Sequence, residues 1–222
     1  MSDFSYIGEA GYHDDQKNVT LINKLDLLKL GETAVDVGAN NGDYTSFFAS
    51  KLGATGKIYS IEILPFTFSH LKNRFSKHNN VTLINMAISD SDGTESIYAG
   101  SSTETVNITG FGTTIDPVYK VGEIQSVKLD TLLRDEDEIA IMKIDVEGAE
   151  LKVLEGMREI ASKTKALLIE CHFHDDWPKI KNILLDDFGF QCYNVGREEH
   201  IDHDSPMPYQ CLCWRENENY SF

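Results

Sequence analysis

Short apolar runs alternate with helical patterns along most of this sequence, and that alternation restricts the fold more than any other feature. Runs typical of buried strands occur at 33–37, 57–63, 81–84, 139–144 and 166–171. Helical spacing of apolar residues follows most of them, at 43–52, 65–77, 148–160 and 177–188. Strands joined through helices lie parallel, so we predict an α/β fold with a doubly wound, mostly parallel sheet.

The last two strand-like runs depart from this alternation. They lie at 190–195 and 209–214, and the stretch 196–208 that joins them has no helical pattern. Neighbouring strands without a helical crossover pair antiparallel, so we expect one reversed strand in the sheet.

Three other regions add to this framework. Residues 17–30 have apolar side chains spaced three apart and predict an amphipathic helix, while 94–99 and 124–129 predict additional strands. The segment 100–122 is the least patterned and is rich in Ser, Thr and Gly, which indicates a long loop. We predict that residues 1–222 form a single domain.

Composition narrows the function classes. The 222-residue chain has a formal charge of -16 and a pI near 4.7. Because so acidic a surface repels phosphate groups, nucleic acids and anionic membranes are disfavoured as partners. Its apolar runs are well below the ~20 residues of a membrane span, and its first residues do not resemble a signal peptide. We therefore expect a cytoplasmic protein with no membrane span. Four cysteines lack zinc-type spacing and are predicted to be buried free thiols: Cys171, Cys192, Cys211 and Cys213.

A glycine turn follows the first strand, in the sequence Asp36-Val37-Gly38-Ala39-Asn40-Asn41-Gly42. Open α/β sheets bind ligands beyond the carboxyl ends of their strands, and glycines there allow a ligand close to the backbone. The turn is not a dinucleotide motif, because Asn40 stands where that motif needs glycine. Glu62 ends the next strand and could accept hydrogen bonds from a ribose diol. A tight turn without a ligand and a solvated carboxylate are the alternatives.

A second motif, Lys143-Ile144-Asp145-Val146-Glu147-Gly148-Ala149-Glu150, places three carboxylates at a strand end and a helix start. Acidic residues in a first helical turn often act only as caps, which is the interpretation that we prefer for Glu150. Asp145 differs, because it ends the strand itself and should face the ligand crevice.

With these residues, the chain resembles the FkbM family of S-adenosylmethionine-dependent methyltransferases. The matching pieces are the glycine turn, the motif 143–150 with Val153-Leu154-Glu155-Gly156, and Leu168-Ile169-Glu170-Cys171-His172. The resemblance covers about residues 30–195. It implies the Rossmann-like class I methyltransferase fold with a seven-stranded sheet. It also implies O-methylation, often of a sugar hydroxyl in a glycan or a natural product.

The resemblance also implies roles for single residues. Asp36, Gly38 and Gly42 would shape the cofactor turn, with Asn40 and Asn41 near the methionine part of S-adenosylmethionine. Glu62 would hold the ribose, Ala87 would lie by the adenine, and Asp145 would face the amino group or the reaction centre. Residues 1–30 would help to cover the cofactor, and 100–122 would be a substrate loop.

Methyl transfer to a hydroxyl needs a general base or a metal ion. Glu170 and His172 end the strand next to that of Asp145 and alternate onto the same side. His172 suits the base because an unperturbed imidazole has a pKa of about 6.5. Alternatively, Asp145, Glu170 and His172 could bind a divalent cation; magnesium prefers oxygen ligands, whereas manganese accepts imidazole more readily.

Two other functions remain open at this point. One is a nicotinamide-dependent oxidoreductase on a similar sheet, which Asn40 and the reversed strand disfavour. The other is a non-catalytic binding module with the same fold. For a methyltransferase, the acceptor would be a small molecule or a glycan, with a deoxyhexose such as rhamnose or fucose suggested by the family. The oligomeric state cannot be predicted from these patterns.

Overall fold

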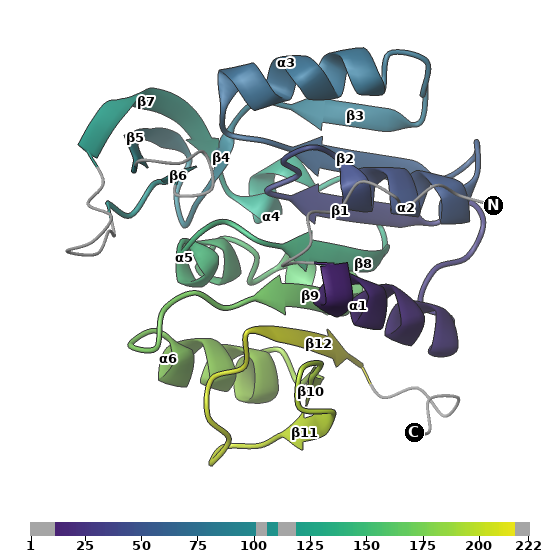
Figure 1. Cartoon of the computed structure of the whole chain (residues 1–222), viewed down its shortest axis with the longest axis vertical. Helices are drawn as coiled ribbons and strands as arrows, with labels where there is room; N and C mark the ends of the chain where they lie inside the picture. Colours follow the sequence, from purple (N-terminus) through teal and green to yellow (C-terminus); the bar gives the residue numbers. More distant parts are fainter. Residues whose placement is uncertain (1–11, 101–105, 111–118, 216–222) are drawn as a thin grey trace.

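The computed structural model describes residues 12–100, 106–110 and 119–215, and it is built on one large twisted sheet (Figure 1). Eight strands lie in the order β11-β10-β12-β9-β8-β1-β2-β3. Their bounds are Thr33–Val37 (β1), Lys57–Ile61 (β2), Val81–Ile84 (β3), Ile139–Ile144 (β8), Thr164–Glu170 (β9), Gln191–Asn194 (β10), Glu199–Ile201 (β11) and Gln210–Trp214 (β12). Five neighbouring strands, β3, β2, β1, β8 and β9, are parallel, which confirms the predicted α/β class.

The predicted seven strands and single reversed strand need correction. Strand β12 pairs antiparallel with both β9 and β10, as expected, but β11 adds an eighth, edge strand that is also reversed. It arises inside 196–208, which the sequence indicated only as a connection. Of its three residues only Ile201 is buried, so no apolar run marks this strand in the sequence.

The helices cover both faces of the sheet. They are α1 (Tyr12–Lys24), α2 (Asp43–Leu52), α3 (Pro65–Arg74), α4 (Leu129–Leu132), α5 (Glu150–Glu155) and α6 (Trp177–Asn182), with a 3-10 turn at Ile160–Lys163 and a π turn at Ile183–Asp187. The predicted helix 17–30 instead ends at Lys24, where Leu25 and Asp26 form a turn and Asp26 has a positive φ of 49°. The helix predicted at 148–160 is shorter at both ends, because Glu147 and Gly148 have positive φ and turns follow Glu155.

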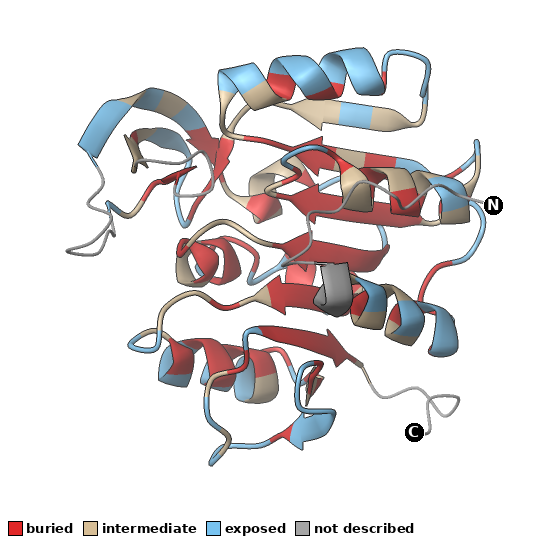
Figure 2. Cartoon of the chain, in the orientation of Figure 1, coloured by how far each residue is buried: buried red, intermediate tan, exposed pale blue. Residues whose placement is uncertain are grey.

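Two apolar layers hold the sheet. On one face, Ile22 of α1 and Phe48 of α2 pack on Ile141 and Leu168. On the other face, side chains of α5 and α6, such as Leu154, pack on the opposite sides of the same strands. Strands β1, β8 and β12 are buried along their whole length, as Figure 2 shows for the centre of the molecule.

A smaller sheet projects beyond the carboxyl edge of the large one, at the left in Figure 1. Its strands are β4 (Ala87–Ile88), β5 (Gly93–Ala99), β6 (Val106–Asn107) and β7 (Tyr119–Val127), in the order β4-β7-β5-β6. We call these strands and the turn 107–110 the arm. The arm replaces part of the loop predicted at 100–122; residues 101–105 and 111–118 lie outside the described residues. Of the predicted N-terminal cover, 12–24 form α1, and 1–11 lie outside the described residues.

The cysteine prediction was wrong for two of the four residues. Cys192 and Cys213 form a disulfide, because antiparallel pairing of β10 and β12 sets them directly opposite each other. Cys171 and Cys211 are buried free thiols, as predicted. Among the helices that the structure describes, none is long and apolar enough to cross a membrane.

Candidate active site

The glycine turn brings the end of β1 against the end of β8. The N–H groups of Gly38 and Ala39 both donate to the carbonyl of Ile61, which ties the turn to β2. Gly38 has a φ of +76°, and a Cβ there would overlap the carbonyl oxygen of Asp145. Glycine is therefore required at position 38 for the two strand ends to approach each other.

A pocket opens at this edge of the sheet, and we call it the cofactor pocket after the predicted cofactor residues in its wall. Five of the predicted cofactor residues line it: Gly38, Asn40, Glu62, Ala87 and Asp145. The two carboxylate oxygens of Glu62 accept hydrogen bonds from the N–H groups of Asn40 (2.9 Å) and Leu64 (2.7 Å). A carboxylate has about four acceptor positions, so Glu62 keeps capacity for a ligand's hydroxyl groups.

The other three predicted cofactor residues do not line this pocket. Asp36 is fully buried and accepts a hydrogen bond of 2.6 Å from the hydroxyl of Thr45. Asn41 is exposed, and its carbonyl accepts a hydrogen bond from Arg74. A Cβ at Gly42 would meet side chains of α3, so this glycine serves packing.

Lys143 joins the two motifs, which the sequence patterns did not indicate. Its ammonium donates to the carbonyl of Gly38 (2.8 Å) and to Asp145 Oδ2 (3.0 Å), and it lies 3.8 Å from Asp36 Oδ1. Burial disfavours its charge, yet Asp145 and Asp36 raise the pKa of Lys143 above its ordinary value. A lysine in an otherwise apolar strand was the available signal.

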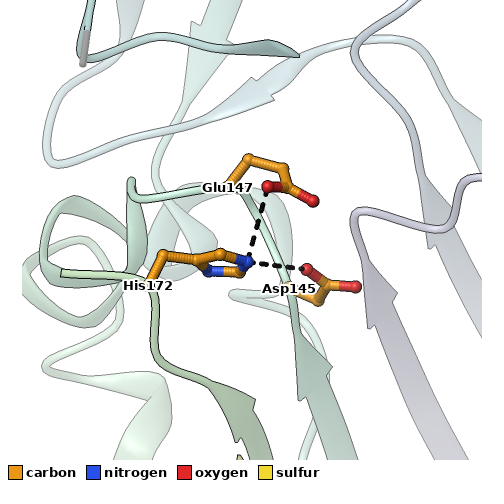
Figure 3. Close-up of side chains that lie close together, drawn as sticks. All are labelled: Asp145, Glu147 and His172. Atoms are coloured by element: carbon orange, nitrogen blue, oxygen red, sulfur yellow. Dashed lines mark ion pairs between the residues drawn. The ribbon is translucent and has the colours of Figure 1, made fainter. Parts of the chain in front are cut away.

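Four carboxylates surround one imidazole beside the pocket; we call this group the His172 cluster. His172 Nδ1 lies 2.7 Å from Glu150, and Nε2 lies 3.3 Å from Glu170, 3.4 Å from Glu147 and 4.0 Å from Asp145. Figure 3 shows the Nε2 edge directed between Glu147 and Asp145. The structure thus brings together the three predicted catalytic residues, and it adds Glu147 and Glu150.

The cluster changes the protonation of its members. Burial opposes a charge on His172, but Glu150 and Glu170 outweigh it and raise the pKa of His172 to about 11. Burial raises the pKa of Glu147 to about 7, although His172 acts in the opposite direction. Burial also disfavours the charge of Glu170, yet hydrogen bonds from His172, Tyr209 and Gln210 lower its pKa. In this arrangement His172 is protonated at neutral pH.

The geometry also changes the candidate metal ligands. Ligand atoms of Asp145, Glu147 and His172 lie within 4.8 Å of one another, whereas Glu170 is engaged by Gln210 and Tyr209. Glu147 reaches this position because its backbone has a φ of +52° and Gly148 follows with +98°. His172 also directs its second nitrogen at Glu150, an arrangement common among metal-binding histidines.

Known structures with the same fold define the class of protein. The fold resembles a precorrin-6y C5,15-methyltransferase from Geobacter metallireducens (16% identity, TM-score 0.50, 91% of this chain and 88% of the other). It also resembles an O-methyltransferase from Thermotoga maritima described as S-adenosylmethionine-dependent (16%, 0.51, 90% and 64%). A third is a putative rRNA methylase from Clostridium thermocellum (12%, 0.50, 90% and 93%). The fold is that of a class I S-adenosylmethionine-dependent methyltransferase.

The family is more specific than the class. Residues 36–192 match the methyltransferase FkbM domain, and the chain belongs to this family. No curated protein matches the sequence significantly. S-adenosylmethionine is therefore the cofactor, in place of the nicotinamide cofactor of the alternative prediction.

The cofactor pocket suits this molecule. Its wall has apolar side chains, such as Ile63, Met86 and Ala87, and polar groups, such as Asn40 and Asp145. S-adenosylmethionine likewise combines a flat base with a charged amino acid.

Proposed function

We propose that this protein methylates a hydroxyl oxygen of a sugar, in a glycan containing a deoxyhexose such as rhamnose or fucose, or of a small natural product. One observation carries the proposal: Asp145 and Glu147 belong both to the wall of the cofactor pocket and to the His172 cluster. Groups that can take up a proton thus adjoin the pocket in which we place the cofactor. A sugar hydroxyl is a weak nucleophile at neutral pH and needs such a group.

The cofactor half of the site binds and orients S-adenosylmethionine. S-adenosylmethionine supplies an electrophilic methyl group on a positively charged sulfur. Glu62 accepts hydrogen bonds from the ribose, Ala87 lies by the adenine, and Asp145 holds the charged amino group. Gly38 and Asn40 offer main-chain groups beside the methionine part.

The His172 cluster handles the proton. Because His172 is already protonated here, Glu147, with a pKa raised to about 7, is the better proton acceptor. The positive charge of His172 attracts the carboxylates of Glu147 and Asp145 and holds them in place. His172 and Asp145 thereby act beside Glu147 at the reaction centre. Glu170 is a positioning residue that fixes the imidazole from its Nε2 side.

The same groups suit a divalent cation, which would displace the proton of His172 and take over its positive charge. Asp145, Glu147 and His172 would hold it, and Asp145 Oδ1 is buried without a hydrogen-bond partner. With one imidazole among its ligands, the site favours manganese over magnesium. There the cation would lower the pKa of an acceptor hydroxyl.

Charge supports a neutral acceptor. The chain has a formal charge of -16, and the cluster itself is acidic. Phosphate backbones would be repelled from such a site, so we favour a small molecule or glycan over nucleic acid.

Mass spectrometry on a panel of neutral glycosides and hydroxylated natural products tests this function. We expect one acceptor to gain the mass of a methyl group, and chelation followed by added Mn²⁺ to reduce and restore the rate. A rate unchanged by chelator would exclude the cation. Tight cofactor binding without methylation of any acceptor would indicate a non-catalytic binding module instead.

A further inference from the structure

The arm lines the cofactor pocket with two segments. One is β4, with Ala87 and Ile88, and the other is Val106, Asn107 and Ile108, which lie about 20 residues beyond the family's adenine segment at Ala87. Ile108 is 6% exposed and packs in one apolar cluster with Ala87 and Ala149. Ile108 therefore packs with Ala87, the residue that the family resemblance places by the adenine.

The turn that presents Ile108 is held by its own hydrogen bonds. Oδ1 of Asn107 accepts from the N–H of Thr109 (3.1 Å), from its hydroxyl (3.2 Å) and from the N–H of Gly110 (2.9 Å). The ring of Tyr98 on β5 lies against Gly110, so close that a Cβ there would approach it to 3.3 Å. These contacts fix the position of Ile108 relative to the arm.

The wall of the pocket combines polar and apolar groups. Asn40, Glu62 and Asp145 line it together with apolar side chains such as Ala87 and Ile108. An adenine base has large apolar faces, which gain most where they displace water from apolar walls. The base therefore belongs against Ala87 and Ile108, which pack in one apolar cluster.

We propose that Ile108 forms a wall of the adenine subsite and that the turn 107–110 of the arm is a cofactor-binding element. This inference rests on the placement of S-adenosylmethionine in the cofactor pocket, and it is independent of the acceptor. The turn 107–110, which lies in the segment 100–122 predicted as a substrate loop, would thus bind the cofactor.

Isothermal titration with S-adenosylhomocysteine, the stable reaction product, tests the proposal without an acceptor. Each CH₂ removed from a fully buried contact weakens binding about fourfold. We expect Ile108→Val to raise Kd about twofold to fourfold, and Ile108→Ala to raise it about tenfold or more. The matched control is Val121→Ala, which removes a 60% exposed side chain from the same arm and should leave Kd unchanged.

The outcomes separate this inference from the proposed function. Unchanged or tighter binding by folded Ile108→Ala, alongside weaker binding by Glu62→Gln, would overturn the wall and keep the pocket. Unchanged binding by both variants would overturn the placement of the cofactor. If Ile108→Ala lowers the unfolding temperature too far for titration, the smaller Ile108→Val change decides, and an unchanged Kd would count against the wall.

Discussion

The two halves of the site are stabilised in opposite ways. In the cofactor pocket, main-chain N–H groups satisfy Glu62, and the remaining walls are mostly apolar. In the His172 cluster, four carboxylates crowd one imidazole, and burial, with a smaller contribution from the neighbouring carboxylates, raises the pKa of Glu147. Like charges at such distances repel, so the surrounding sheet must hold them together. The carboxylate in the pocket thus has its hydrogen bonds from the main chain, whereas the carboxylates of the cluster are stabilised by a positive charge among them, on His172 or on a bound cation.

The largest effect should come from the residue where the two halves touch. In Gly38→Ala, the new Cβ overlaps the Asp145 carbonyl, and the backbone has a positive φ. We expect stability to fall by about 3 kcal/mol or more, and affinity for S-adenosylhomocysteine to be lost. Thermal unfolding and titration would measure both. Gly122→Ala, where a Cβ meets nothing within 4 Å, should match wild type; a stable, binding Gly38→Ala would refute the close approach.

Removing the imidazole of His172 should impair methyl transfer without impairing cofactor binding. We expect His172→Ala to lower turnover by about 10²-fold or more, with Kd for S-adenosylhomocysteine changed less than about threefold. Single-turnover rates and titration measure the two quantities. The exposed neighbour His174 provides the control His174→Ala, which should keep wild-type turnover. Equal losses of turnover and affinity in His172→Ala would contradict two separable halves.

The strain within the cluster should appear as a pH dependence of stability. The pKa of Glu147 is about 7 in the folded protein and 4.5 in the unfolded chain. A raised carboxyl pKa favours the folded state at low pH, and this contribution is lost as pH rises between those two values. For His172, the raised pKa gives stability that is present below 6.5 and lost as pH rises towards about 11.

Glu147→Gln should remove the loss of stability that accompanies ionisation of Glu147. In chelator-treated protein, we expect its unfolding temperature to fall less than that of wild type between pH 5 and pH 7.5, values that bracket the Glu147 shift. Glu159→Gln, at an exposed position, should follow wild type. If the unfolding temperatures of all three proteins changed in parallel with pH, the surroundings of Glu147 would not disfavour its charged form.

The smallest effect concerns a predicted residue that lies outside the pocket wall. The side chain of Asn41 is exposed, and only its carbonyl takes part in a contact, with Arg74. We expect Asn41→Ala to change Kd for S-adenosylhomocysteine less than about twofold, whereas Asn40→Ala, at a residue that lines the pocket, should weaken binding more. A reversed order in titration would move the boundary of the cofactor pocket.

Local patterns in the sequence determined the succession of strands and helices along the chain, the glycine turn and the positions of Glu62 and Asp145 at strand ends. Each depends on neighbours within a few residues: periodicity marks β1 and α2, and glycine marks the turn that follows β1. Glu170 and His172 were also predictable as neighbours, because they stand two residues apart at and just after the end of β9, where alternation puts them on one side.

Tertiary structure alone decided which distant side chains meet. Cys192 pairs with Cys213 through strand register, and Lys143 on β8 reaches the carbonyl of Gly38 at the end of the neighbouring β1. Glu150, predicted only as a helix cap, lies 2.7 Å from His172. Within the arm, the turn 107–110 packs Ile108 with Ala87 of β4. These contacts depend on strand order, register and the path of the arm, none of which has a signature in short-range spacing. The sequence by itself therefore determined the fold and half of the site, and the packing of the sheet assembled the rest.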